Sequence, residues 1–125
     1  PLTQFVQTLE KIAQSLRLHG VQPLLMTLPP IDAQRYLNFI CRDGCNRDNI
    51  THWLGDTQRI YHYQEMYSAA IARCAWQLGL PLIDIRSAFL PERNLSDMIA
   101  ADGIHLTMKG YEKMFGVLCA GVQSL

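Results

Sequence analysis

Two short apolar segments alternate with amphipathic helical patterns, and this order is the strongest constraint on the fold. The segments are VQPLLMTL at residues 21–28 and LPLIDI at residues 80–85. Both are predicted to be buried β-strands. Strands in the order α-β-α-β-α run parallel and are joined by a right-handed crossover helix. The sequence therefore predicts an α/β domain, a three-layer sandwich with helices on both faces of a parallel sheet.

Three helical patterns flank the strands. The first can be closed by Gly20, and its apolar face consists of Phe5, Leu9, Ile12 and Leu16. The second starts near Thr57, ends at Gly79 and carries on one face Ile60, Tyr63, Tyr67, Ala70, Ile71, Cys74 and Leu78. The third follows Thr107, a suitable N-cap, and carries Tyr111, Met114, Phe115, Leu118 and Val122.

Residues 31–55 have no stable period, although IDAQRYLNFI could form a short helix. A connection of this length is usually functional or partly helical. Because it follows the first strand, we expect it to fold over the carboxyl end of the sheet. There it would contribute to a substrate pocket.

The composition excludes several classes of function. Eleven basic and eleven acidic side chains give a formal net charge of zero, so nothing in the bulk electrostatics indicates nucleic acid binding. No apolar run approaches the roughly 20 residues needed to cross a bilayer, and stable membrane insertion is not expected.

The four cysteines are expected to be unpaired or loosely paired thiols. Two fall in helical apolar patterns, where cysteine acts as a small hydrophobic residue: Cys74 and Cys119. Cys41 and Cys45 stand in a polar loop and could form a disulfide or half of a metal site. Their spacing to His52 and His62 matches no compact zinc finger, so no metal is predicted. This cysteine usage favours a reducing, cytoplasmic setting.

The stretch AADGIHLTMKGYEKMF places Asp102 and His105 on a glycine-containing turn directly before the last helix. The pair is either a general base with its orienting carboxylate or a capping Asp beside a solvated His. Ligand sites in parallel sheets lie beyond the carboxyl ends of the strands, where the loop with this pair falls. This position favours the functional interpretation and predicts a hydrogen bond between the two side chains. Asp84, at the end of the second strand, could support such a site or cap the following turn.

Two strands are too few for an independent sheet, which generally needs three or more. At least one strand would expose an unpaired apolar edge, and such an edge invites association with another chain. The sequence is therefore expected to represent the second half of a larger α/β domain.

The segments LIDIRSAFL and DGIHLTMKGYEKMF resemble the C-terminal part of the SGNH hydrolases, also called GDSL esterases and lipases. LLMTLPPID, WLGD and YQEMYSAAIA fit the same alignment, so the resemblance covers essentially all 125 residues. It implies a flavodoxin-like α/β/α sandwich, of which residues 1–125 form the C-terminal part of a single domain. It also implies carboxylic ester hydrolysis by a Ser-His-Asp mechanism without metal or cofactor. His105 would be the general base, and Asp102 would orient it.

The nucleophile of that family stands in a G-D-S block and an oxyanion donor in a G-x-N-D block, and neither block occurs in this sequence. Pro1 falls about where the helix after the second block would start. The N-terminal part is therefore expected to be missing, and the chain alone is expected to be inactive. The serines that are present are not expected to replace the nucleophile: Ser15, Ser68, Ser87, Ser96 and Ser124.

The expected ligands and partners follow from the resemblance and from the strand edge. The substrate would be a small-molecule or lipid ester. The edge would be covered by the N-terminal half of the same precursor or by a second copy of the chain. An alternative function is a non-catalytic interaction module that binds a partner at this edge. The retained Asp102 and His105 favour the hydrolase, whereas the missing nucleophile favours the module.

Overall fold

Two short parallel strands and seven helical segments make up the computed structural model, which describes residues 1–124. In chain order the elements are α1 (Leu2–Leu18), β1 (Leu25–Met26), α2 (Ala33–Ile40), α3 (Arg47–Leu54), α4 (Gln58–Leu78), β2 (Leu82–Ile83), α5 (Ile85–Phe89), the 3-10 helix η1 (Leu95–Met98) and α6 (Met108–Gln123).

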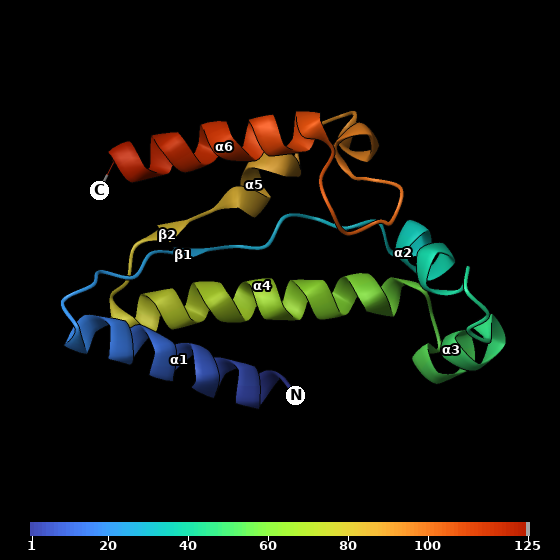
Figure 1. Cartoon of the computed structure of the whole chain (residues 1–125), viewed down its shortest axis with the longest axis horizontal. Helices are drawn as coiled ribbons and strands as arrows, with labels where there is room; N and C mark the ends of the chain where they lie inside the picture. The colour runs from blue at the N-terminus through green and yellow to red at the C-terminus, as the bar shows by residue number, and fades with distance from the viewer. Residues whose placement is uncertain (125) are drawn as a thin grey trace.

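The strands lie between two layers of helices, with α1 and α4 on one face and α5 and α6 on the other (Figure 1). β1 and β2 pair in parallel, with Leu25 opposite Leu82 and Met26 opposite Ile83. The predicted α/β class and parallel sheet are therefore confirmed, and the molecule forms part of a three-layer sandwich.

The strands are shorter than the apolar segments suggested. Thr27 N still donates to Ile83 O at 3.1 Å, but the next residue leaves the ladder. The backbone N–H of Leu28 donates to the buried Ser68 Oγ on α4 at 3.1 Å. The Ser68 hydroxyl on α4, the helix that joins the two strands, thus accepts the hydrogen bond that Leu28 N–H would donate to a neighbouring strand in a longer ladder.

The hydrophobic core has two parts. The larger part lies among β2, α5, η1 and the turn before α6, and it consists of Ile83, Ile85, Phe89, Met98 and Leu106. The smaller part joins α1 to the end of α4 and the start of the second strand segment through Ala13, Ala75 and Leu80. Both parts pack a helical layer to the sheet, as expected for apolar strands covered on two faces.

The long helices follow their predicted boundaries closely. Gly79 ends α4 in the left-handed conformation with a φ of 58°, which favours glycine at this position. Thr107 caps α6, and its Oγ1 accepts from Gly110 N at 3.4 Å. The face predicted for α1 is only partly packed, because Ile12 and Leu16 remain exposed.

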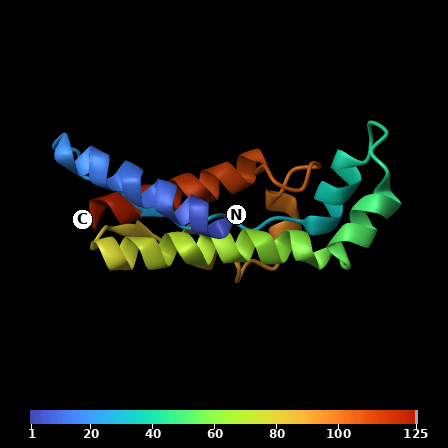
Figure 2. The same ribbon diagram turned by 90° about the horizontal axis from the view of Figure 1, so that it is seen from below.

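Residues 31–55 contain two helices, of which the sequence predicted only the first. Asp32 caps the N-terminus of α2, and its Oδ1 accepts from Arg35 N at 3.0 Å. Asn46 caps α3 in the same way, and its Oδ1 accepts from Asn49 N at 3.0 Å. Figure 2 shows that these helices project beyond one end of the sheet, the end at which the turn before α6 also lies.

Among the helices of residues 1–124, none combines the length and the apolar character that crossing a bilayer requires.

Candidate active site

The turn that carries Asp102 and His105 is a small hairpin at the carboxyl end of the sheet. An antiparallel bridge between Ile99 and Leu106 closes it. Ala100 N donates to His105 O at 2.8 Å, which fixes the backbone on both sides of the turn. The chain after β1 is joined to the same turn, because Asp32 N donates to Gly103 O at 2.8 Å. The loops that follow the two strands therefore meet, as expected for a ligand site in a parallel sheet.

The predicted contact between Asp102 and His105 is present. Asp102 Oδ2 lies 2.5 Å from His105 Nδ1, while Oδ1 accepts from the backbone N–H groups of Ile104 and His105 at 3.0 Å each. The bond from the His105 ring, followed by these two backbone bonds, lowers the pKa of Asp102 from 3.8 to about 2. The carboxylate is therefore ionised at neutral pH and holds a proton on Nδ1 of the ring.

The second nitrogen of the His105 ring is free to act on another group. The side chain is 67% exposed, against 17% for Asp102. Within residues 1–124 the ring makes no other hydrogen bond than the one to Asp102. A neutral imidazole with its proton on Nδ1 presents a lone pair at Nε2, which is the arrangement of a general base.

The first turn of α2 holds the hairpin in place. Gly103 has a φ of 81°, and a Cβ there would lie 2.4 Å from Tyr36 N and 2.5 Å from Asp32 O, so only glycine fits. Arg35 Nη1 donates to Ser96 O at 2.9 Å and to Ile99 O at 2.7 Å. The expectation that residues 31–55 cover this end of the sheet is thus met by α2.

A second polar cluster lies at the ends of both strands. Thr27 Oγ1 donates to Asp84 Oδ1 at 2.9 Å and accepts from Arg86 N at 3.0 Å. The Arg86 guanidinium, on a side chain only 12% exposed, pairs with Glu65 and with the Tyr61 hydroxyl on α4. This cluster locks the crossover helix to the start of α5.

Asp84 caps α5, one of the two roles that the sequence allowed. Its carboxylate accepts from Ser87 N at 3.2 Å and from Ser87 Oγ at 2.5 Å. Desolvation acts to raise the pKa of Asp84, but the bonds from Ser87 and Thr27 and the charge of Arg86 outweigh it, so the pKa is lowered.

The serine hydroxyls have other partners or lie elsewhere. Ser68 Oγ is buried and serves Leu28 N, and Ser87 Oγ serves Asp84. Across residues 1–124 no serine hydroxyl is hydrogen-bonded to the His105 ring, including those of Ser15, Ser96 and Ser124.

The residues considered as metal ligands form no cluster. Cys41, Cys45, Cys74 and Cys119 are free thiols. In the part of the chain that the structure describes, no three His, Cys, Asp or Glu side chains gather as a metal site would require. Burial, followed by the charge of Glu10, raises the pKa of the Cys74 thiol, as expected for an interior thiol.

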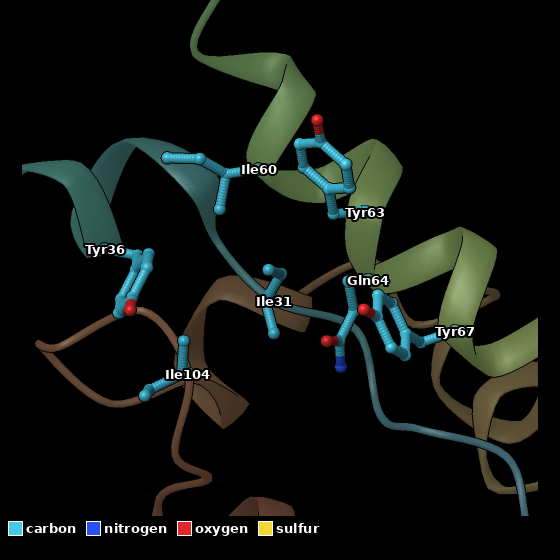
Figure 3. Close-up of a pocket in the computed structure, with 7 residues that line it drawn as sticks. All are labelled: Ile31, Tyr36, Ile60, Tyr63, Gln64, Tyr67 and Ile104. Atoms are coloured by element: carbon cyan, nitrogen blue, oxygen red, sulfur yellow. The ribbon is translucent and has the colours of Figure 1, made fainter. Parts of the chain in front are cut away.

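A pocket of about 370 Å³ opens between the hairpin and α4. Figure 3 shows its walls, which come from the chain after β1, from α2, from α4 and from the hairpin: Ile31, Tyr36, Ile60, Tyr63, Gln64, Tyr67 and Ile104. Tyr63, predicted for the packed face of α4, remains partly exposed because this pocket lies beside it. The prediction that residues 31–55 would line a pocket at this end is met by Ile31 and Tyr36, whereas the walls from α4 and the hairpin were not predicted.

Residues 1–118 match the sequence profile of the family described as GDSL-like lipase/acylhydrolase. The chain belongs to this family. The predicted resemblance to GDSL esterases and lipases is therefore confirmed, on nearly the whole length of the chain.

Two relatives extend the comparison of this GDSL-like chain. It is 26% identical over 118 residues to the GDSL esterase/lipase CPRD49 of Arabidopsis thaliana, a match that covers 93% of this chain and 42% of that protein. Its fold matches the crystal structure of the lipase/acylhydrolase from Enterococcus faecalis with a TM-score of 0.69 and 18% identity. That match covers 99% of this chain and 52% of the other. The chain thus spans about half the length of these relatives.

Proposed function

We propose that this chain supplies the general base of a serine-dependent carboxylic ester hydrolase, with His105 as the base and Asp102 as the residue that orients it. The observation that carries the proposal is the 2.5 Å contact from Asp102 Oδ2 to His105 Nδ1 on a ring that is 67% exposed. Membership of the GDSL-like lipase/acylhydrolase family supports the reaction class.

The geometry suits the transfer of a proton from a serine hydroxyl to the alcohol that leaves the ester. His105 Nε2 accepts the proton of a serine hydroxyl while the serine oxygen attacks the ester carbonyl. The imidazolium is stabilised by the ionised Asp102, whose low pKa prevents it from taking the proton itself. Collapse of the tetrahedral intermediate releases the alcohol, to which Nε2 returns the proton. Water then attacks the acyl-enzyme by the same route, and the acid is released.

The nucleophile and the oxyanion donors would come from polypeptide outside these 125 residues, because no serine within residues 1–124 is bonded to the ring. The relatives are about twice as long as the matched region, which leaves room for such a segment. We propose that it forms the N-terminal half of the same domain. A second copy of this chain would not serve equally well, since it brings the same serines.

The open edge of β1 is the surface on which that half would pack. Within residues 1–124 the sheet contains only β1 and β2, so one side of β1 has no strand partner. Apolar side chains remain exposed on α1, β1 and α6, among them Ile12, Met26 and Phe115. Further strands beside β1 would satisfy its free backbone groups and bury apolar surface of this kind.

Ester hydrolysis by the complete protein tests the proposal. We expect it to hydrolyse a short-chain p-nitrophenyl ester, and we expect His105→Ala to lower kcat by roughly 10³-fold, because proton transfer by a positioned base contributes on this scale. His52→Ala changes an exposed histidine on α3 and is the matched control. The 125-residue polypeptide alone should be inactive.

Three results would contradict the proposal. Turnover by the 125-residue polypeptide that depends on His105 would identify a nucleophile among the serines set aside above. Full activity of the His105→Ala protein would exclude His105 as the base. Absence of hydrolysis by the complete protein, combined with binding of another protein at the β1 edge, would favour the non-catalytic interaction module.

A further inference from the structure

The pocket between the hairpin and α4 has the features of a substrate subsite. We propose that it binds one compact, uncharged group of the ester, either a short aliphatic chain or a single aromatic ring. The inference rests on the proposed function and deepens it, because it names the class of substrate. Its grounds are the position of the pocket, the rigidity of its walls and the chemistry of its lining (Figure 3).

The position of the pocket is next to the proposed base. Ile104, which forms one wall, stands between Asp102 and His105 in the hairpin. Its backbone N–H is held by Asp102 Oδ1 at 3.0 Å, so the wall and the carboxylate are one unit. A group of the substrate seated against Ile104 would contact the residue directly before His105 in the hairpin.

The walls of the pocket are fixed by contacts outside it. Tyr36 belongs to the first turn of α2, whose backbone lies against Gly103. Gln64 Nε2 donates to Pro29 O at 3.1 Å, which ties α4 to the chain after β1. The ring of Tyr67 packs edge-on against Phe5, with ring centres 4.9 Å apart. A pocket held in this way does not have to be ordered by its ligand, and this lowers the cost of binding.

The lining selects for uncharged groups. Three isoleucines, three tyrosines and one glutamine surround the cavity, and no charged side chain is among them. An acid or a phosphate would lose its hydration there without gaining a partner of opposite charge. The volume of about 370 Å³ lies near the lower end of the range for ligand pockets, roughly 300–1,000 Å³. A short chain or one ring fits this volume.

Two series of esters identify which part of the substrate enters the pocket. In one series the alcohol is kept as p-nitrophenol, and the acyl group grows from acetyl to butyryl, hexanoyl, benzoyl and dodecanoyl. In the other the acyl group is acetyl, and the alcohol grows from ethyl to hexyl and benzyl. The complete protein should prefer the intermediate groups in one series, because each methylene that fits an apolar pocket raises kcat/KM by about tenfold or more. Dodecanoyl should fall below hexanoyl if the acyl series is the one that responds.

Variants of Ile60 test the assignment to this pocket. Ile60 lines the cavity from α4, far in sequence from the hairpin. Ile60→Trp fills the cavity and should lower kcat/KM for hexanoyl or benzoyl relative to acetyl esters by at least about tenfold, since the pocket loses room for one or more carbon atoms. Ile60→Ala enlarges it, should move the preference to longer groups, and provides a readout if the Trp variant folds poorly. Ala69→Trp, on an exposed position of the same helix, is the matched control.

The outcomes separate this inference from the proposed function. His105-dependent hydrolysis with selectivity that changes in both Ile60 variants, but not in Ala69→Trp, supports the pocket assignment. His105-dependent hydrolysis with the same selectivity in all variants overturns it and leaves the proposed function intact. It would indicate that another segment of the polypeptide fills the cavity. Hydrolysis that does not depend on His105 overturns the proposed function, and the subsite proposal fails with it.

Discussion

Asp84 and Asp102 stand in two local arrangements that are nearly the same and that lead to different roles. Each carboxylate accepts a backbone N–H from the residue three positions on, and each also bonds the side chain of that residue. The pKa of each is lowered by these bonds. The difference lies in the partner. Ser87 completes a helix cap, whereas His105 keeps a second ring nitrogen that faces solvent.

The surroundings of the two carboxylates widen this difference. Asp84 also binds Thr27, which in turn is bonded to Arg86 N, so the cluster fixes the crossover helix to the end of the sheet. Asp102 has no partner outside its own hairpin within the described residues. An Asp that is shared between elements stabilises the fold. Asp102, bonded only within its own hairpin, is the carboxylate proposed to orient the base, and the following predictions test this distinction.

The largest effect is expected when Asp102 is replaced by its amide, with the same replacement at Asp84 as the comparison. Asp102→Asn should lower kcat of ester hydrolysis by about 10³-fold, because a neutral amide neither fixes the tautomer of His105 nor stabilises its charged form. Asp84→Asn keeps a capping oxygen and should leave kcat unchanged. Steady-state kinetics of the two variants are the measurement, and equal losses in both would abolish the distinction between the clusters.

The second prediction concerns the stability that the Asp84 cluster supports. Arg86→Met should lower the free energy of unfolding by about 2 kcal/mol, since Glu65 would lose its partner for a charge that is largely buried. The loss is smaller than for a fully buried pair because Glu65 is about one third exposed, and solvent screens its charge.

Urea unfolding followed by circular dichroism measures this loss. The matched control is Lys113→Met, which breaks the more exposed pair with Glu92 and should cost less than Arg86→Met. A smaller loss for Arg86→Met than for Lys113→Met would mean that the Arg86 pair does not anchor the crossover helix.

The third prediction concerns the support of the hairpin by α2. Arg35→Ala should lower kcat by about tenfold with little change in KM for an acetyl ester, because the two carbonyl contacts that position the hairpin are lost. Arg35→Lys retains one charged donor and should recover part of the rate. Arg42→Ala, at an exposed position after α2, is the control. If Lys restores nothing and KM rises instead, Arg35 does not act by positioning.

The smallest effect is a change in the titration of Asp102. Its folded-state pKa of about 2 lies below the ordinary value of 3.8, so the ionised form favours folding above that value. This contribution is lost as the pH falls from about 4 to about 2. In the His105→Ala protein the largest cause of the shift is removed, and the pKa should rise but stay below 3.8, because the backbone bonds remain. Carboxyl carbon NMR across this pH range measures the midpoint, and an unchanged value would contradict the assigned cause.

The sequence by itself determined the features that depend on local pattern. The apolar periods gave the boundaries of α4 and α6, and the alternation of helices and strands gave the parallel sheet. The spacing of Asp102 and His105 on a glycine turn was enough to predict their contact, since only four consecutive residues are involved. Two short helices, α3 and α5, were not predicted in this way, whereas α2, which is as short as α3, was. α3 and α5 are recognised by the capping residues Asn46 and Asp84 rather than by an apolar period.

Tertiary structure alone decided which distant residues support the site. Arg35 reaches Ile99 across 64 positions of sequence, and Arg86 meets Glu65 and Tyr61 from another element. Such contacts depend on how the helices are placed on the sheet, and the hydrophobic periodicity of the sequence does not predict them. The same holds for the walls that α4 and the hairpin contribute to the pocket, and for the exposed half of the α1 face. Packing against other elements, rather than local propensity, sets these features.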